Sequence, residues 1–251
     1  MQTRLLFISD LHLQPARTDI TATLLRFLAQ HRGQCTALYI LGDLFEAWIG
    51  DDGADAMALR VAAALHAFAE SGSQIYLMHG NRDFLLGKEF AQRCQAELLF
   101  DPFPIDTTLG PILLSHGDAL CTDDVDYQQF RQQVRDPSWQ QRFLSQPLKE
   151  RRAFAEQARQ RSAAATADKD EGIMDVNPGA VEQLMRQHKL PRLLHGHTHR
   201  PAQHRLDFDP PLAEADSGWR LVLGDWHERG WFARIDSDGI TLQHFALAAD
   251  A

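Results

Sequence analysis

Long hydrophobic runs and cysteines are both scarce in this 251-residue chain. No apolar stretch approaches the ~18 residues that indicate a membrane-spanning helix. The apolar run at residues 5–8 is far too short for the core of a signal peptide, so we expect a cytoplasmic protein. The three cysteines, Cys35, Cys94 and Cys121, are odd in number and lack the spacing of metal ligands. We therefore expect neither a disulfide framework nor a zinc ribbon.

Basic residues are also in short supply. Lysine and arginine number 25 against 34 aspartate and glutamate residues, which gives a net charge of −9. A protein that binds nucleic acid nonspecifically is usually basic, so we expect no nucleic-acid partner. Hydrophobic residues make up 44% of the chain and charged residues 24%, which is typical of a soluble globular protein and excludes disorder, collagen and coiled coil as the main architecture. The length suits one large domain, or one domain with an insertion.

One segment departs from this acidic average. Residues 131–161 contain eight basic and three acidic residues, so the segment carries +5 and the rest of the chain −14. The basic residues are Arg131, Arg135, Arg142, Lys149, Arg151, Arg152, Arg159 and Arg161. Aromatic residues are interleaved with them, a combination that suits an anionic membrane surface or an anionic lipid.

Strand-like and helix-like segments alternate along the first half of the chain. Short apolar runs predict strands that are buried on both faces, and apolar residues spaced by three or four predict helices between them. Asp19 is the predicted N-cap of the first helix. The predicted strands are residues 5–8, 37–41, 75–78, 112–114 and 192–194, followed by a β-rich end at 203–207, 219–223, 231–235 and 241–245. This pattern indicates α/β layering.

Residues 123–170 follow a helical pattern throughout. Pro137 and Pro147 divide this segment into three predicted helices, because proline is tolerated only in the first turn of a helix. The apolar content is too high for a linker, so we expect a helical cap inserted into a core formed by residues 1–122 and 171–251.

Polar residues that can bind metals follow five of the predicted strands. The candidate ligands are Asp10, His12, Asp43, Asn81, His116, His197 and His199. If the chain stays extended, Asp10 and His12 point to one side, and so do His197 and His199. These ligands suit Mn²⁺, Fe²⁺ or Zn²⁺. Seven are too many for one metal with an open position, but they fit two ions that share a carboxylate, an arrangement that clamps a phosphoryl group and activates water.

The ordered motifs resemble the signature of calcineurin-like metallophosphoesterases. The matching phrases are Asp10-x-His12, Gly42-Asp43, Gly80-Asn81-Arg82-Asp83, His116 and Gly196-His197-Thr198-His199. The resemblance implies a four-layer αββα sandwich with the metals at its edge. It also implies that Asp10, His12, Asp43 and His199 hold one ion, that Asp43, Asn81, His116 and His197 hold the other, and that Asp43 is the bridge.

One position departs from the common family motif, which has histidine where this chain has Arg82. A guanidinium does not give up its proton at neutral pH, but it binds phosphate oxygens in a fork. Four features together resemble the branch of the family that hydrolyses UDP-2,3-diacylglucosamine in lipid A biosynthesis. They are Arg82, the run at residues 41–51, the phrase Ser115-His-Gly-Asp118 and the cap. The implied reaction is attack of water on the α-phosphate, which yields UMP and 2,3-diacylglucosamine 1-phosphate (lipid X).

The same resemblance implies the site residues and the surroundings of the enzyme. The implied catalytic residues are Asp43, Asn81, Arg82 and His116, and the implied substrate contacts are Asn81, Arg82, Asp124, Ser162, Thr166, Lys169 and His197. The residues alone favour an ordinary solvated helix face for Ser162, Thr166 and Lys169, and only the resemblance favours contacts with the head group. We expect two Mn²⁺ ions, a monomer, and peripheral attachment to the cytoplasmic side of the bacterial inner membrane.

Four apolar residues of the predicted cap are candidates to line an acyl-chain groove: Phe130, Trp139, Phe143 and Leu144.

Two alternative functions remain open from the sequence. The first alternative is another phosphoesterase, such as a nuclease or a nucleotide pyrophosphatase. The acidic core and the lipid-like cap oppose the nuclease. The second is a noncatalytic scaffold with this fold, which should have lost ligands, whereas here every ligand position is filled.

Overall fold

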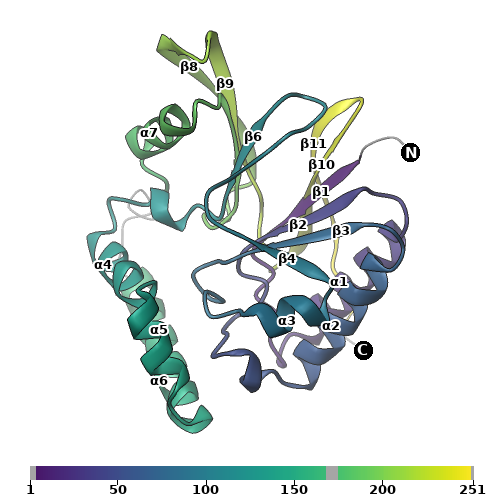
Figure 1. The fold of residues 1–251 in the computed structure, drawn as a ribbon, viewed down its shortest axis with the longest axis vertical. Coiled ribbons are helices and arrows are strands. Elements are labelled where there is room, and N and C mark those ends of the chain that lie inside the picture. Colours follow the sequence, from purple (N-terminus) through teal and green to yellow (C-terminus); the bar gives the residue numbers. More distant parts are fainter. Residues whose placement is uncertain (1–3, 168–174, 250–251) are drawn as a thin grey trace.

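Two β-sheets packed face to face form the centre of the protein (Figure 1). The computed structural model describes residues 4–167 and 175–249, without the side chains of residues 161–167. The first sheet has the order β11-β10-β1-β2-β3-β4, in which β1 to β4 are parallel and β10 runs antiparallel to β1. Its strands are β1 (Leu5–Ile8), β2 (Ala37–Leu41), β3 (Gln74–Met78), β4 (Ala96–Leu99), β10 (Arg229–Asp236) and β11 (Gly239–Ala246).

The second sheet has the order β5-β6-β7-β9-β8. Its three central strands are parallel, and the two edge strands run antiparallel to their neighbours. The strands are β5 (Phe103–Ile105), β6 (Ile112–Ser115), β7 (Arg192–His195), β8 (Ala202–Leu212) and β9 (Ala215–Val222). Since β1, β2, β3, β6 and β7 all precede candidate ligands, the two sheets together determine where those ligands lie.

Alternation along the strands shows the layering. Leu6 and Ile8 of β1 pack in one cluster with residues of α1 (Thr18–His31), α2 (Ala56–Ala69) and α3 (Lys88–Arg93). Leu5 and Phe7 pack instead in a second cluster with residues of the other sheet. A strand covered on both faces reads as a continuous apolar run, which explains the pattern at residues 5–8.

The outer face of the second sheet is covered in the same way. Leu113 of β6 and Leu193 of β7 pack against Val181 and Met185 of α7 (Pro178–His188). The order helix, sheet, sheet, helix is the expected αββα sandwich, and that prediction is confirmed.

Two short strands were missed, and one predicted helix N-cap was wrong. The missed strands are β4 and β5. For β5 the reason is Pro104, because proline argues against a strand unless the strand lies at the edge of a sheet. β5 is such an edge strand. Asp19 lies inside the first turn of α1, whose N-cap is Arg17, and its carboxylate accepts hydrogen bonds from the Arg17 guanidinium at 2.7 and 2.9 Å. Helix α7 begins with Asn177 as its N-cap and Pro178 in its first turn.

The segment between β6 and α7 forms three helices that lie to one side of the sandwich (Figure 1). These are α4 (Val125–Val134), α5 (Pro137–Leu144) and α6 (Leu148–Ala167), so the predicted division at Pro137 and Pro147 is confirmed. Below we call these helices the cap. Among the described residues, no helix combines the length and the apolar character needed to cross a membrane.

Candidate metal centre and active site

The seven predicted ligands all lie just beyond the carboxyl ends of their strands. Asp10 and His12 follow β1, Asp43 follows β2 and Asn81 follows β3 in the first sheet. From the second sheet, His116 follows β6, and His197 and His199 follow β7. Ligand sites of open α/β sheets form where the carboxyl ends of strands meet, and here the ends of two sheets converge.

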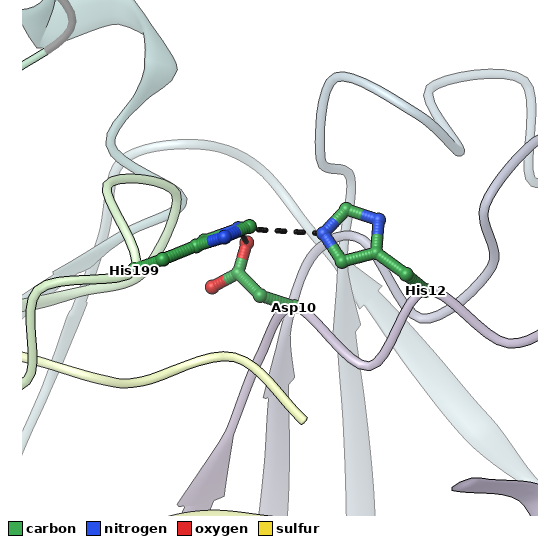
Figure 2. Close-up of side chains that lie close together, drawn as sticks. All are labelled: Asp10, His12 and His199. Carbon is green, nitrogen blue, oxygen red and sulfur yellow. Dashed lines mark hydrogen bonds and ion pairs between the residues drawn. The ribbon is translucent and has the colours of Figure 1, made fainter. Parts of the chain in front are cut away.

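Asp10, His12 and His199 form the first group (Figure 2). The Nε2 atoms of His12 and His199 are 3.4 Å apart, and His199 Nε2 lies 3.5 Å from Asp10 Oδ1. One ligand atom from each of the three residues lies within 4.8 Å of the others. Asp10 is fully buried, whereas the side chain of His199 is 37% exposed, so the group opens towards solvent on the histidine side.

Asp43 lies between this group and a second one. Its Oδ2 is 3.7 Å from His12 Nε2, and its Oδ1 is 3.8 Å from His116 Nε2. Asp10, Asp43 and His116 also offer ligand atoms within 4.8 Å of one another. Asn81 joins them, because its Oδ1 is 3.0 Å from His116 Nε2. Each oxygen of Asp43 therefore faces a histidine of a different group.

His197 completes the set from the other side of His116. The two imidazole rings meet edge to face with centroids 5.0 Å apart. The backbone N–H of His197 donates to Asp10 Oδ2 at 2.9 Å, and the Ser9 hydroxyl donates to the same oxygen at 2.5 Å. These two donors fix the carboxylate of Asp10 and leave its Oδ1 towards the histidines.

The backbone of the ligand loops is strained, which the sequence did not predict. Asp10, His12, Asp43, His197 and His199 all have φ between 50 and 70°, a left-handed conformation that costs non-glycine residues energy and clusters at functional sites. The Asp-x-His and His-x-His phrases are therefore not extended, so the condition set for a common direction of their side chains is not met. The side chains converge because the loops turn, not because a strand alternates.

Two glycines permit the close approach of the ligand loops. A Cβ on Gly80 would lie 2.0 Å from Asp43 Oδ1 and 2.3 Å from Asp43 N. A Cβ on Gly196 would lie 2.3 Å from Asp10 Oδ2. Both positions leave no room for a side chain, so the two buried carboxylates rest directly against bare backbone.

Asp83 and Glu46 support the ligands, and sequence reasoning assigned neither a role. The buried carboxylate of Asp83 accepts hydrogen bonds from the backbone N–H groups of Leu44 at 2.8 Å, Gly80 at 2.8 Å and Asp43 at 3.2 Å. It ties the loop after β2 to the loop after β3. Glu46 Oε2 lies 3.1 Å from His12 Nδ1, the kind of carboxylate partner that orients a metal-binding imidazole. The available signals were the position of Asp83 in the Gly80–Asp83 phrase and that of Glu46 in the run at residues 41–51.

The charges of the site favour a cation. Burial lowers the pKa of His12, but the hydrogen bond to Glu46 and the nearby carboxylates, Asp43 first, outweigh it and raise the pKa to about 9. For His116 the carboxylates, again Asp43 first, overcome burial and raise the pKa to about 9. Burial lowers the pKa of His197 to about 3, with help from the charge of His116. The carboxylates that raise the pKa of two of these rings also attract metal ions, and the lowered pKa of His197 favours the neutral form that binds metals.

The surroundings of the Asp10 carboxylate show whether these residues fit a divalent cation. Its Oδ1 is buried and has no hydrogen-bond partner within the described part of the chain. Leaving a buried carboxylate oxygen without a partner is costly, and a cation held between Asp10, His12 and His199 would satisfy it. The donors are oxygens and imidazole nitrogens, which suit divalent metals. The residues therefore fit the metal ions that the family resemblance implies.

Arg82 lies at the same edge, with its backbone inside the site. Its N–H donates to Asp43 Oδ1 at 2.8 Å, and one guanidinium nitrogen is 3.8 Å from Glu46 Oε1. Its Nε is buried without a hydrogen-bond partner among the described residues. The guanidinium is thus held beside the metal ligands with donor capacity left for an anion.

The remaining predicted substrate residues lie on or beyond the cap. Asp124 is the N-cap of α4, where its carboxylate accepts a hydrogen bond from Tyr127 N at 3.1 Å. Ser162 and Thr166 belong to the backbone of α6, but their side chains lie outside the described residues, and so does Lys169 altogether. Their predicted contacts with substrate stay predictions.

Asp118 links the cap to the ligand loops, and sequence reasoning did not assign it this role. This fully buried carboxylate accepts from the Tyr127 hydroxyl at 2.6 Å and from Arg131 Nε at 2.8 Å. The Tyr127 ring in turn stacks on His197 with centroids 6.0 Å apart. The first cap helix is therefore docked directly on a predicted metal ligand.

The cap uses its aromatic and basic residues differently from what we expected. Phe143 is buried in the main core cluster, with Trp139 stacked on it at 4.9 Å, so Phe143 serves packing. Leu144 is 40% exposed and remains available to line a groove. Arg131 and Arg151 face inward, each paired with an aspartate. Only part of the basic excess, such as exposed Arg142 and Lys149, is free to meet an anionic surface.

Comparisons with known proteins show which family this chain belongs to. The model of the calcineurin-like phosphoesterase family matches residues 3–201. A UDP-2,3-diacylglucosamine hydrolase of Xanthomonas oryzae pv. oryzae is 51% identical over 249 residues, covering 96% of this chain and 99% of the relative. A UDP-2,3-diacylglucosamine hydrolase of Stenotrophomonas maltophilia is 48% identical, covering 96% and 98%. Among solved structures, Vps29 of Chaetomium thermophilum is similar with a TM-score of 0.46 and 10% identity, over 99% of this chain and 100% of that one.

Proposed function

We propose, because this chain belongs to the calcineurin-like phosphoesterase family, that it is a hydrolase that cleaves the pyrophosphate bond of UDP-2,3-diacylglucosamine in lipid A biosynthesis. The products are UMP and 2,3-diacylglucosamine 1-phosphate. The observation that carries this proposal is the identity of about half of all positions with hydrolases of that name, over nearly the whole of both chains. Because the match covers 96% of this chain, it extends over the cap as well as the family core.

Divalent metal ions are part of this proposal. The family and the donor set support them, and we propose two ions, most suitably Mn²⁺. Asp10, His12, Asp43 and His199 would hold one, and Asp43, Asn81, His116 and His197 the other. When bound, the ions supply Lewis-acid stabilisation of the phosphoryl oxygens and lower the pKa of coordinated water. The two oxygens of Asp43, each 3.7 or 3.8 Å from a histidine of a different group, support its role as the bridge.

The residues of the site bind and orient the pyrophosphate. Arg82 binds phosphate oxygens through its guanidinium, whose Nε has no partner among the described residues, and so offsets negative charge that develops as water attacks the α-phosphorus. Asn81 and His197, which both contact His116, are further candidates for contacts with the pyrophosphate. Asp83 keeps the loops of Asp43 and Asn81 in register. A sugar phosphate is already a good leaving group, so the absence of the histidine found in the common motif is tolerated.

The cap holds the acylated sugar in this proposal. Leu144 and partly buried Phe130 and Trp139 are candidates for contacts with acyl chains. Asp124, Ser162, Thr166 and Lys169 are candidates for contacts with the head group. Exposed Arg142 and Lys149 suit peripheral attachment to the anionic cytoplasmic side of the inner membrane. We propose that the enzyme works as a monomer.

Substrate comparison tests the function directly. The purified protein with Mn²⁺ should hydrolyse UDP-2,3-diacylglucosamine far faster than UDP-glucosamine, because each buried methylene contributes roughly 0.8 kcal/mol. Bis-p-nitrophenyl phosphate and single-stranded DNA serve as probes of the alternative phosphoesterases, and chelation of the metal should stop turnover. Equal rates on the acylated and unacylated UDP-sugars, or a preference for DNA, would refute the proposal.

The position of bond cleavage is a second test. Hydrolysis in ¹⁸O-water should place the label in UMP, because water attacks the α-phosphorus. Mass spectrometry of both products measures the outcome. Label in the lipid phosphate would mean attack at the β-phosphorus and a different pose of the substrate.

Arg82 offers a third test, which separates phosphate binding from metal binding. Arg82→Ala should lower kcat by roughly 10²–10³-fold, the cost of removing a charge-stabilising donor, and should leave the metal content unchanged. Arg82→His restores the common motif but should not restore the rate, because the fork is lost. Native turnover by Arg82→His would show that this position needs only a general polar group.

A further inference from the structure

Arg151 is the one buried residue among the arginines and lysines whose side chains the structure describes, with its side chain 3% exposed. A guanidinium keeps its charge at any physiological pH, so burying it requires partners for its donors. The basic segment of the sequence predicted a solvent-facing or membrane-facing residue here, and the structure contradicts that prediction for Arg151.

The partners of Arg151 come from both the cap and the core. Its Nε donates to the carbonyl of Gln146 at 3.0 Å, in the turn between α5 and α6. One terminal nitrogen donates to the carbonyl of Ile49 at 2.6 Å and to Asp52 Oδ1 at 2.8 Å. The other pairs with Asp52 Oδ2. The guanidinium therefore binds the carboxylate as a fork and joins α6 to the short helix η1 (Asp51–Gly53).

Residues 49–52 of the core form the binding site for the Arg151 side chain. Gly50 has φ +117°, a conformation that L side chains rarely adopt. A Cβ at this position would also lie 2.6 Å from a terminal nitrogen of Arg151 and 2.8 Å from Leu144 Cδ2. Gly50, the carbonyl of Ile49 and the carboxylate of Asp52 thus provide the space, the acceptor and the countercharge for one arginine of the cap.

The binding site for Arg151 and the candidate active site share the loop that follows β2. The backbone N–H of Trp48 donates to the carbonyl of Arg82 at 3.1 Å. Glu46, two residues earlier, lies 3.8 Å from the Arg82 guanidinium and 3.1 Å from His12 Nδ1. Arg159, two turns along α6 from Arg151, lies 3.9 Å from Glu46. The loop that receives Arg151 is therefore the loop that positions Arg82.

We propose that Arg151 and Asp52 form a latch that holds α6 in a fixed place relative to Arg82, so that the substrate half bound by the cap is aligned with the half bound at the metal edge. Arg151 acts as a positioning residue and touches neither the metals nor the phosphate. The latch rests on the proposed function, because it assumes that the cap binds the acylated sugar.

Neighbouring Arg152 is exposed and provides a matched control. Arg151→Ala should raise KM for UDP-2,3-diacylglucosamine in mixed micelles roughly 10- to 100-fold, the factor expected for loss of hydrogen bonds to a charged group, with a smaller change in kcat. Turnover of bis-p-nitrophenyl phosphate and metal content should stay at the wild-type level, since neither requires an aligned cap. Arg152→Ala should leave all of these quantities unchanged.

Two further variants separate the latch from simple loss of stability. Arg151→Lys keeps the charge but not the fork, so it should not restore KM. Asp52→Ala should act in the same direction as Arg151→Ala, and the double variant should be no worse than Arg151→Ala alone, which is the signature of a coupled pair. Thermal melts confirm that each variant is folded. A folded Arg151→Ala with wild-type KM, or with equal losses on both substrates, would overturn the latch.

Hydrogen exchange distinguishes failure of the latch from failure of the proposed function. If the wild-type protein does not hydrolyse the diacyl substrate, the proposed function is wrong, but the anchor itself remains measurable. Amide exchange in residues 148–160 should be faster in Arg151→Ala than in wild type and in Arg152→Ala, because α6 loses its attachment to the core. Unchanged exchange in this segment would refute the latch whatever the substrate is.

Discussion

Replacing Asp43 with alanine should abolish turnover and reduce metal binding at both proposed positions. The two oxygens of Asp43 lie 3.7 and 3.8 Å from His12 and His116, so one substitution removes a ligand from each group. Because bound metals contribute several kcal/mol of charge stabilisation to such reactions, kcat/KM should fall roughly a thousandfold or more. Kinetics and metal analysis by mass spectrometry measure the two effects.

Asp106 provides a control for the loss of a carboxylate. It is exposed and follows β5, which runs antiparallel to β6, so it lies at the end of that sheet opposite to the ligand loops. Asp106→Ala should bind metal and turn over substrate as wild type does. An Asp43→Ala protein that keeps full metal stoichiometry and rate would exclude a shared carboxylate.

Replacing Gly80 with alanine should be nearly as damaging, although it removes no chemical group. The new methyl group would lie 2.0 Å from Asp43 Oδ1 and 2.3 Å from Asp43 N, so the loop of Asp43 or the loop of Asn81 must move. Asp83 binds both loops, and a shift of one therefore disturbs the other. Because misplacement of reacting groups by about 1 Å can cost 10²-fold, we expect kcat/KM to fall roughly a hundredfold with weaker metal binding.

Gly179 in α7 is the matched control for this substitution. Apart from its chain neighbours and the backbone of its own helix, the nearest described atom to an added Cβ is Asn177 Oδ1, at 3.2 Å, and alanine favours helix over glycine. Gly179→Ala should leave activity unchanged. Wild-type activity of Gly80→Ala, in a protein with an unchanged melting temperature, would show that Asp43 does not rest against Gly80 in the working enzyme.

The sequence by itself determined most of the strands and helices of this protein and the candidate ligands that follow them. Each candidate ligand follows an apolar run that becomes a strand, and parallel strands of an α/β sheet bring their carboxyl ends to one edge. The identities of Asp10, His12, Asp43 and the others, and even the three cap helices, were therefore readable from local patterns and from the family resemblance. Short, irregular strands such as β5 were not, because Pro104 argues against a strand unless its neighbours are known.

Only the tertiary structure decided how the ligands converge and what holds them. The sequence suggested extended Asp10-x-His12 geometry, but the loops adopt positive φ, which nearby packing imposes at a local energetic cost. Asp83 binds a loop about 40 residues earlier, and Arg151 finds Asp52 at a separation of 99 residues. Periodicity and motif spacing describe only residues that are close along the chain. A buried charge needs a partner, and that partner can lie anywhere in the sequence, so only the tertiary structure identifies it.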